Sequence, residues 1–113
     1  MSQMQYPVGI IGGGAWGTAL AAVMAQIHDR VLIWAREEEA VQSINNLREN
    51  SLFLPGTSLS SKIEATADLA RMIACENLLI VTPAQHVRAT LSALPATQAP
   101  LILCAKGIEA DTQ

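Results

Sequence analysis

Apolar runs of strand length alternate with segments of helical composition along most of this chain. Five such runs predict β-strands, over residues 6–11, 30–35, 62–65, 77–81 and 101–105. The segments between them predict helices, over residues 15–27, 37–50, 67–74 and 85–94. Because strands that alternate with helices form parallel sheets through crossover connections, this order predicts an α/β fold with a doubly wound parallel sheet.

The predicted helices differ in how their apolar residues are distributed. The first is apolar almost all round, which predicts that it is buried. In the second, Val41, Ile44 and Leu47 recur at three-residue spacing, which predicts one buried stripe. Thr66 precedes the third helix and is a suitable N-cap.

The composition indicates one small domain with a buried sheet. The chain has 113 residues, of which 50% are hydrophobic and 15% are charged. This apolar excess is typical of parallel strands buried on both faces, and it is equally expected if one surface normally packs on another segment. Cys75 and Cys104 each adjoin an apolar run, which predicts two buried, reduced thiols.

A glycine pattern, G-x-G-x-x-G, follows the first predicted strand and opens the first predicted helix, in the residues Gly12-Gly13-Gly14-Ala15-Trp16-Gly17. In this context Gly12 allows a sharp turn, Gly14 allows a pyrophosphate to approach the backbone, and Gly17 allows the helix to pack close to the strand. The N–H groups and the dipole at the helix start attract phosphate charge. The pattern therefore predicts a dinucleotide site. Trp16 within it either packs under the cofactor or fills the gap between sheet and helix, and we expect the second.

Further candidates stand where other predicted strands end, since ligands of such sheets bind beyond the carboxyl ends of the strands. Arg36 suits a 2′-phosphate and so favours NADPH, although it can also stack on adenine, and Glu37 beside it could contact a 2′-hydroxyl. Lys106 suits a substrate phosphate or carbonyl oxygen, or is an ordinary surface lysine. His86 begins the fourth helix and is either structural or a ligand contact.

Several classes of function are disfavoured by charge and composition. A net charge of -3 without a basic stripe argues against nucleic acid as a partner. No cysteine and histidine spacing resembles a metal site. The longest apolar run, residues 19–25, is shorter than the roughly 20 residues that span a bilayer, so we expect a cytoplasmic protein without a membrane segment.

Five short motifs follow one another along the chain. They are the glycine segment extended to Ala21, Trp34-Ala35-Arg36, the I-N-x-x-R-x-N-x-x-F-L-P-G segment from Ile44 to Gly56, Thr82-Pro83-Ala84-Gln85, and Ala105-Lys106-Gly107-Ile108-Glu109. In this order they resemble the NAD(P)-dependent glycerol-3-phosphate dehydrogenases in their bacterial form. Two positions depart from the family's pattern: Ala15 replaces a serine or asparagine, and Thr82 replaces a valine.

The resemblance implies reduction of dihydroxyacetone phosphate to sn-glycerol 3-phosphate by NADPH or NADH, a step that feeds phospholipid synthesis. It implies that residues 12–17 hold the pyrophosphate and that Arg36 holds the adenosine end of NADP or NAD. It further implies that Lys106 contacts both cofactor and substrate, and that His86 lies near the nicotinamide ribose. A cation near the carbonyl oxygen would stabilise the developing alkoxide.

The family has a second, helical domain that carries the catalytic lysine. By the resemblance, residues 1–113 form the N-terminal, incomplete part of the Rossmann-type domain, which alone is expected to be inactive and to expose an apolar edge that favours self-association, for instance as a homodimer. Two other interpretations stay open. One is another two-domain dehydrogenase, such as a ketopantoate reductase or a hydroxyacid dehydrogenase, and the other is a nucleotide-binding module without catalysis.

Overall fold

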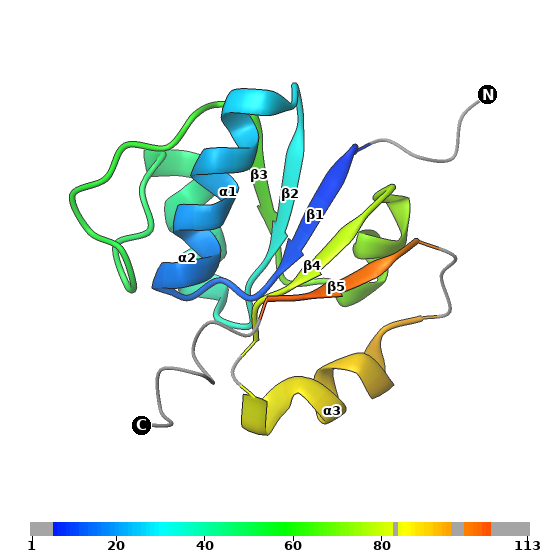
Figure 1. The fold of residues 1–113 in the computed structure, drawn as a ribbon. Helices are drawn as coiled ribbons and strands as arrows, with labels where there is room; N and C mark the ends of the chain where they lie inside the picture. Colours follow the sequence, from blue (N-terminus) through cyan, green and yellow to red (C-terminus); the bar gives the residue numbers. More distant parts are fainter. Residues whose placement is uncertain (1–5, 83, 96–98, 105–113) are drawn as a thin grey trace, which may run out of the picture.

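The computed structural model describes residues 6–82, 84–95 and 99–104, which contain one sheet of five parallel strands (Figure 1). The strands are β1 (Val8–Ile11), β2 (Val31–Trp34), β3 (Ile63–Thr66), β4 (Leu78–Ile80) and β5 (Leu101–Leu103). Their order across the sheet is β3-β2-β1-β4-β5. The chain thus moves outward from β1 in one direction and then in the other, which confirms the predicted doubly wound, Rossmann-type fold.

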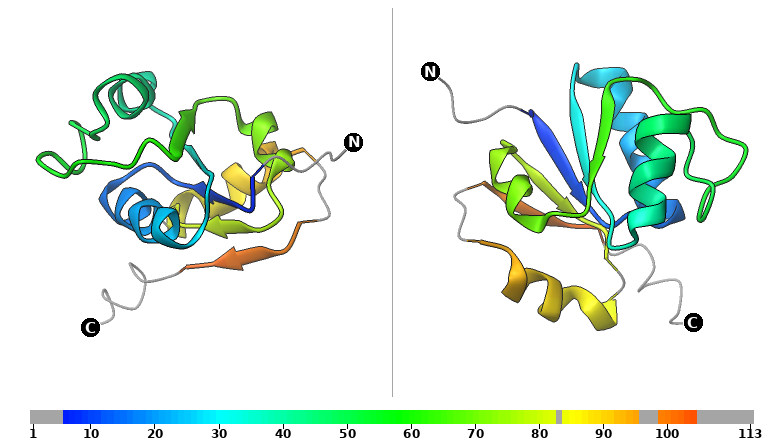
Figure 2. Two further views of the ribbon diagram at one scale, coloured as in Figure 1. Left: turned by 90° about the horizontal axis from the view of Figure 1, so that it is seen from above. Right: turned by 180° about the vertical axis from the view of Figure 1, so that it is seen from behind.

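Helices cover the sheet on both faces. The helical elements are α1 (Ala15–Ile27), α2 (Glu38–Gln42), the π-helix η1 (Ser43–Leu47) that continues α2, the 3₁₀-helix η2 (Leu69–Ala74) and α3 (Ala84–Ala93). Figure 2 shows α1 and α2 grouped together, with α3 apart from them. The strands lie within two residues of their predicted ends, and α1 has its predicted bounds.

Two apolar clusters, one on each face of the sheet, make the core. Alternate residues of β1 and β2 point to opposite faces. Ile10 and Ile33 belong to the cluster under α1 and α2, whereas Ile11 and Leu32 belong to the cluster with η2 and α3. All four side chains are fully buried, so the central strands are buried on both faces, as the composition predicts.

Helix α1 is buried only along one side, which corrects the expectation of a buried helix. Ala21 and Ala25 face the sheet and are buried, while Val23 and Ile27 are 47% and 67% exposed. The reason is geometric: one face of the helix packs on the sheet, and no described residue covers the opposite face. The alanine and glycine content instead allows a close approach of α1 to the strands.

The second helix changes pitch before it ends, and this moves one predicted core residue to the surface. Val41 and Ile44 are buried as predicted, but Leu47 is 66% exposed. A π-helix hydrogen bond reaches one residue further than an α-helical one, so the three-residue spacing no longer returns to the same face. Arg48 then adopts a left-handed conformation with φ of 57°, and the helix stops short of the predicted residue 50.

The third helix begins two residues later than predicted. Asp68 is its N-cap, and the Asp68 side chain accepts a hydrogen bond from the Ala70 N–H at 3.0 Å. Thr66 is not the cap; its hydroxyl instead accepts from the Asp68 N–H and shapes the turn before η2. Both side chains therefore act at this helix start, in an order that the sequence pattern does not show.

Side chains from the second helical segment cover β3, which lies at one end of the sheet. The Asn45 amide donates to the Ala65 carbonyl at 3.0 Å and accepts from the Ala65 N–H at 2.8 Å. Arg48 Nη1 donates to the carbonyl oxygen of Ile63 at 2.6 Å. These bonds satisfy backbone groups that would otherwise leave an open strand edge.

Candidate functional site

The carboxyl ends of β1, β2 and β4 meet at one edge of the sheet (Figure 1). The Gly12 N–H donates to the Trp34 carbonyl at 3.0 Å, which joins the glycine turn to the end of β2. On the other side, the Thr82 hydroxyl donates to the Ile11 carbonyl at 3.1 Å. The structure thus brings together the predicted segments that follow β1, β2 and β4, because parallel neighbours end side by side.

The glycine turn has the geometry that its sequence predicts at two of its three glycines. Gly12 has a φ of 135°, a conformation that side chains rarely tolerate, and a Cβ there would lie 3.0 Å from the Thr82 nitrogen. A Cβ on Gly17 would overlap the Gly12 carbonyl oxygen. The sharp turn and the close helix packing are therefore both confirmed.

The N-terminus of α1 is open. Gly14 is the N-cap, no side chain caps the helix, and the first turn carries no acidic residue. A Cβ on Gly14 would meet no atom within 4 Å, so there is space beside this glycine. A helix start without a side-chain cap and without a competing carboxylate can accept an anion.

Trp16 does not fill the gap between sheet and helix, contrary to expectation. It is 41% exposed, and its neighbour Ala15 is exposed as well. Both lie in the first turn of α1. The buried residues at this end of α1 are instead Gly17 and Thr18.

Two opposite charges lie beside the turn at the end of β2. The side chain of Arg36 is 69% exposed, and its Nε lies 3.9 Å from Oε2 of Glu37. A Cβ on Gly13 would overlap the Cβ of Ala35, the residue before Arg36, so the end of β2 lies tightly against the glycine turn. Neither side chain is fixed in place by burial.

The other predicted residues are only partly described. His86 is half-buried in the first turn of α3. Lys106 lies outside the described residues. Cys104, expected to be buried, is half-buried because it follows the exposed edge strand β5, whereas Cys75 is buried as predicted.

Sequence reasoning assigned no role to Asn50, whose side chain is fully buried beneath the glycine turn. Its Nδ2 donates to the Gly13 carbonyl and to the Thr18 hydroxyl, each at 2.8 Å. The one feature of the sequence that points to Asn50 is its place as the last residue of the I-N-x-x-R-x-N motif. Its partners are 37 and 32 residues away in the sequence, so no local pattern identifies them.

The other ionisable cluster lies at the opposite edge of the sheet, near the amino ends of the strands. The Tyr6 hydroxyl donates to Glu64 at 2.7 Å, and Arg71 donates to both of them. Burial acts to raise the pKa of Glu64, but the hydrogen bonds from Tyr6 and Arg71 outweigh it and hold that pKa below its ordinary value. These contacts join Tyr6, which precedes β1, to β3 and η2, and they lie away from the glycine turn.

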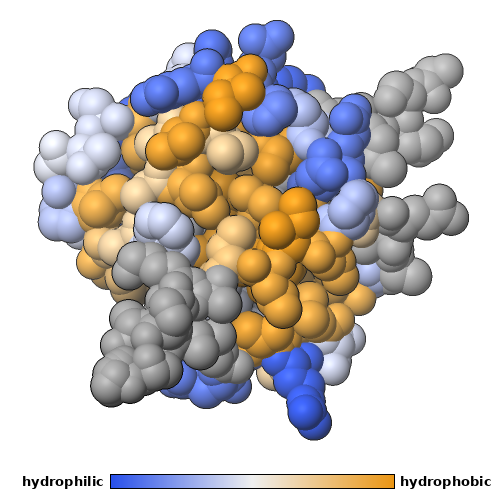
Figure 3. All heavy atoms as spheres, in the orientation of Figure 1, coloured by the Kyte–Doolittle hydropathy of each residue, from blue (hydrophilic) through white to orange (hydrophobic). Residues whose placement is uncertain are grey.

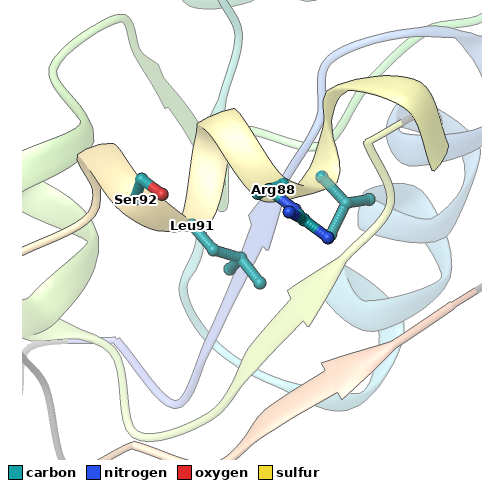
Figure 4. A pocket seen from close by; sticks show the side chains of 4 residues that line it. Arg88, Leu91 and Ser92 are labelled. Atoms are coloured by element: carbon teal, nitrogen blue, oxygen red, sulfur yellow. The ribbon is translucent and has the colours of Figure 1, made fainter.

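An open depression beside α3 lies outside the predicted site (Figure 4). The described residues that line it are Val87, Arg88, Leu91 and Ser92, and none of them is a predicted ligand contact.

In the part of the chain that the structure describes, no cluster of histidine, cysteine or acidic residues could hold a metal ion. Nor is any helix there long and apolar enough to cross a membrane.

Comparison with known proteins gives one consistent result. The family model described as the N-terminus of NAD-dependent glycerol-3-phosphate dehydrogenase matches residues 7–113. A protein of Parvibaculum lavamentivorans called glycerol-3-phosphate dehydrogenase [NAD(P)+] is 51% identical over 108 residues, and one of Erythrobacter litoralis with the same name is 48% identical over 109. These alignments cover 93% and 96% of this chain but 32% and 33% of the relatives, so the chain spans about a third of their length.

Solved structures with the same fold carry the same name. The glycerol-3-phosphate dehydrogenase of Plasmodium falciparum matches with a TM-score of 0.78 at 29% identity, over 88% of this chain and 32% of that one. The glycerol-3-phosphate dehydrogenase of Coxiella burnetii matches with a TM-score of 0.74 at 28% identity, over 91% of this chain and 34% of that one. The likeness therefore extends over almost all of this chain.

Proposed function

The chain belongs to the NAD-dependent glycerol-3-phosphate dehydrogenase family, and from this membership we propose that it forms the cofactor-binding part of an enzyme that reduces dihydroxyacetone phosphate to sn-glycerol 3-phosphate. The observation that carries the proposal is the open N-terminus of α1, set directly after the Gly12 turn. Such a start offers N–H donors and a favourable dipole to a pyrophosphate. The product would serve as a precursor of phospholipids, in the cytoplasm.

The space beside Gly14 supports the proposal that a dinucleotide binds here. In this proposal the backbone of residues 12–17 holds the pyrophosphate, and the absence of a side chain on Gly14 leaves room for its close approach. Ala15 contributes its backbone N–H alone, since it has no polar side chain. The exposed Trp16 lies over the same end of α1 and would border the bound ligand.

We propose that NADPH is the preferred cofactor. The Arg36 guanidinium is exposed at the end of β2 and can form forked hydrogen bonds with a 2′-phosphate. Glu37 would repel that phosphate, but its contact with Arg36 is long, at 3.9 Å, and both side chains can turn away from each other. The charge balance at this end of the site decides between NADPH and NADH.

The remaining assignments rest on the motifs shared with the family. Lys106 would contact both cofactor and substrate, where an ammonium group stabilises negative charge that develops on the carbonyl oxygen. His86, in the first turn of α3, would border the nicotinamide ribose. When bound, the nicotinamide supplies the hydride. We assign the proton donor to none of the 113 residues, and we propose that they form one incomplete domain.

The test is a turnover assay of the full-length natural protein. We expect oxidation of NADPH that depends on dihydroxyacetone phosphate. The oxidation is measured as the loss of absorbance of the reduced nicotinamide. Substitution Lys106→Ala should abolish turnover while leaving NADPH binding within roughly tenfold, since the pyrophosphate contacts remain. Turnover with ketopantoate and none with dihydroxyacetone phosphate would assign the protein to another dehydrogenase class, and cofactor binding without any turnover would indicate a binding module.

A further inference from the structure

The most deeply buried polar side chain near the glycine turn belongs to Asn50. It is 0% exposed, and every polar group on a buried amide needs a hydrogen-bond partner because an unsatisfied one destabilises the fold. Its two amide hydrogens go to the Gly13 carbonyl and the Thr18 hydroxyl, and its oxygen accepts from the Phe53 N–H at 3.2 Å. The amide therefore bridges three segments: the glycine turn, the start of α1 and the turn after residue 50.

The hydrogen bond from Asn50 to the Gly13 carbonyl fixes the orientation of the whole peptide unit between Gly13 and Gly14. Peptide units are planar and no cis peptide occurs among the described residues, so the Gly13 carbonyl and the Gly14 N–H point in opposite directions from one rigid plane. Because Asn50 holds the carbonyl from below, the Gly14 N–H points away from Asn50. Within the described residues this N–H makes no hydrogen bond.

The glycine turn needs such a restraint. Gly12, Gly13 and Gly14 are consecutive, and glycine loses more conformational freedom on ordering than any other residue. Among the described residues, the one other side chain that bonds to the Gly13 carbonyl is Thr18, whose hydroxyl donates at a long distance of 3.5 Å. Without Asn50, the peptide between Gly13 and Gly14 could rotate and turn its N–H away from a ligand.

We propose that Asn50 is a positioning residue for the pyrophosphate: by holding the Gly13 carbonyl it aims the Gly14 N–H at the bound phosphate. The proposal rests on the proposed function, because it concerns the same dinucleotide site. It assigns a role to the last residue of the I-N-x-x-R-x-N motif. A hydrogen-bond donor that is already held in place raises the affinity of the site for its ligand, because it does not have to be ordered when the ligand binds.

The chain offers a matched control in Asn45, five residues earlier in the same segment. The Asn45 amide also bonds to backbone, donating to and accepting from Ala65, but on the edge strand β3. Replacement of either asparagine by serine removes a comparable side-chain amide. Only Asn50→Ser removes a restraint on the glycine turn, and the serine hydroxyl can still accept locally from the Phe53 N–H.

The experiment compares ligand binding by the full-length natural protein and by its Asn50→Ser and Asn45→Ser variants, with calorimetry at fixed ionic strength. The probes are ADP-ribose, NADH and NADPH, which share a pyrophosphate, and adenosine 2′-monophosphate, which lacks one. We expect Asn50→Ser to raise the Kd of the three pyrophosphate ligands by about tenfold and by a common factor, since the Gly14 N–H would no longer be aimed at the charged phosphate that all three share. Adenosine 2′-monophosphate should be bound within about twofold of the wild type, as should all four probes by Asn45→Ser.

A second measurement needs no variant. In a nuclear magnetic resonance titration of the wild-type protein with ADP-ribose, the Gly14 amide should show the largest downfield shift among the glycines of the turn. An unmoved Gly14 amide would overturn the proposal, as would equal affinities of the Asn50→Ser and wild-type proteins. If the wild-type protein binds none of the pyrophosphate ligands, the proposed function itself fails, which distinguishes the two failures.

Discussion

Gly17 packs against Gly12 so closely that a Cβ on Gly17 would overlap the Gly12 carbonyl oxygen. The first turn of α1 thereby rests directly on the backbone of the turn that precedes it. Three residues before Gly17, Gly14 has the opposite surroundings, because a Cβ there would meet no atom within 4 Å. One glycine is thus required by packing, while the other leaves space for a ligand.

This contrast predicts different effects of the same substitution at the two positions. Gly17→Ala should force α1 away from β1 and lower the free energy of unfolding by about 1–3 kcal/mol, as overpacked sites do. Gly14→Ala should change it by less than about 0.5 kcal/mol, since Gly14 has an extended conformation with φ of -76° that alanine can adopt. Gly14→Ala should nevertheless weaken NADPH binding by about tenfold or more, because its methyl group would occupy the approach of the pyrophosphate.

Denaturant unfolding and calorimetric titration of the full-length natural protein measure both quantities. Tight cofactor binding by Gly14→Ala would contradict the proposed path of the pyrophosphate. Unchanged stability of Gly17→Ala would show that the helix can shift at little cost.

The selectivity between NADPH and NADH should depend on Arg36. Arg36→Ala removes the one charge that can form forked bonds with a 2′-phosphate at the end of β2, so we expect NADPH affinity to fall by about tenfold or more. NADH affinity should change by less than about threefold, because NADH has no 2′-phosphate. Competition titrations of the two cofactors give the ratio directly.

Glu37→Gln is the matched control for this prediction. It removes the neighbouring negative charge without shortening the side chain, so NADPH affinity should rise slightly. An equal loss of NADPH and NADH affinity in Arg36→Ala would indicate that Arg36 stacks on the adenine and does not read the phosphate.

The strands themselves and the position of the glycine turn could be predicted because they depend on local signals. Apolar runs mark the strands, and the alternation with helices places their carboxyl ends on one edge of the sheet. The exposure of Leu47 could not be predicted, because the π-helical turn changes the number of residues per turn without a local sequence signal. The contact between Asn50 and Gly13 joins residues far apart in the sequence, so only the folded sheet reveals it.

Acid should destabilise the fold partly through Glu64. Hydrogen bonds from Tyr6 and Arg71 hold the pKa of Glu64 below its ordinary value of 4.5, against the opposing effect of burial. A carboxyl whose pKa is lowered in the folded state stabilises that state above the unfolded pKa, and this contribution is lost as the pH falls through the folded pKa. We therefore expect the Tm of the wild-type protein to fall more steeply below about pH 4.5 than that of Glu64→Gln.

Thermal unfolding followed by circular dichroism between about pH 6 and pH 3 would measure this difference. Arg30→Gln is a useful control, since Arg30 is 3.9 Å from Glu64 at the surface and should alter the profile less than Arg71→Gln. Parallel profiles of the wild type and Glu64→Gln would contradict the prediction.

Cys75 should be inert towards thiol reagents in the folded protein. Burial raises the pKa of its thiol to about 12, although the charge of Arg71 acts to lower it. Since the thiolate is the reactive form, a Cys104→Ser variant should react with iodoacetamide at about pH 8 only after denaturation. Cys104 is half-buried, so a Cys75→Ser variant should react in the native state at a measurable rate. Equal native rates for the two variants would contradict the predicted difference.

The 113-residue chain should associate with itself through β5. This strand lies at one end of the sheet, and Leu101, Ile102 and Leu103 are 45%, 46% and 62% exposed. Figure 3 shows apolar side chains gathered over the middle of the face that β5 crosses in Figure 1. An open apolar edge offers unpaired backbone groups to a second copy of the chain, and a lysine on such an edge opposes pairing.

We therefore expect sedimentation velocity to show association that increases with concentration and that Leu103→Lys suppresses. Ile27→Lys is the matched control, because Ile27 is similarly exposed, at 67%, but lies at the end of α1 and not on a strand edge. If the edge strand is responsible, Ile27→Lys should leave association nearly unchanged. Equal suppression by the two variants would indicate general apolar contact in place of strand pairing, since each adds the same charge to the surface.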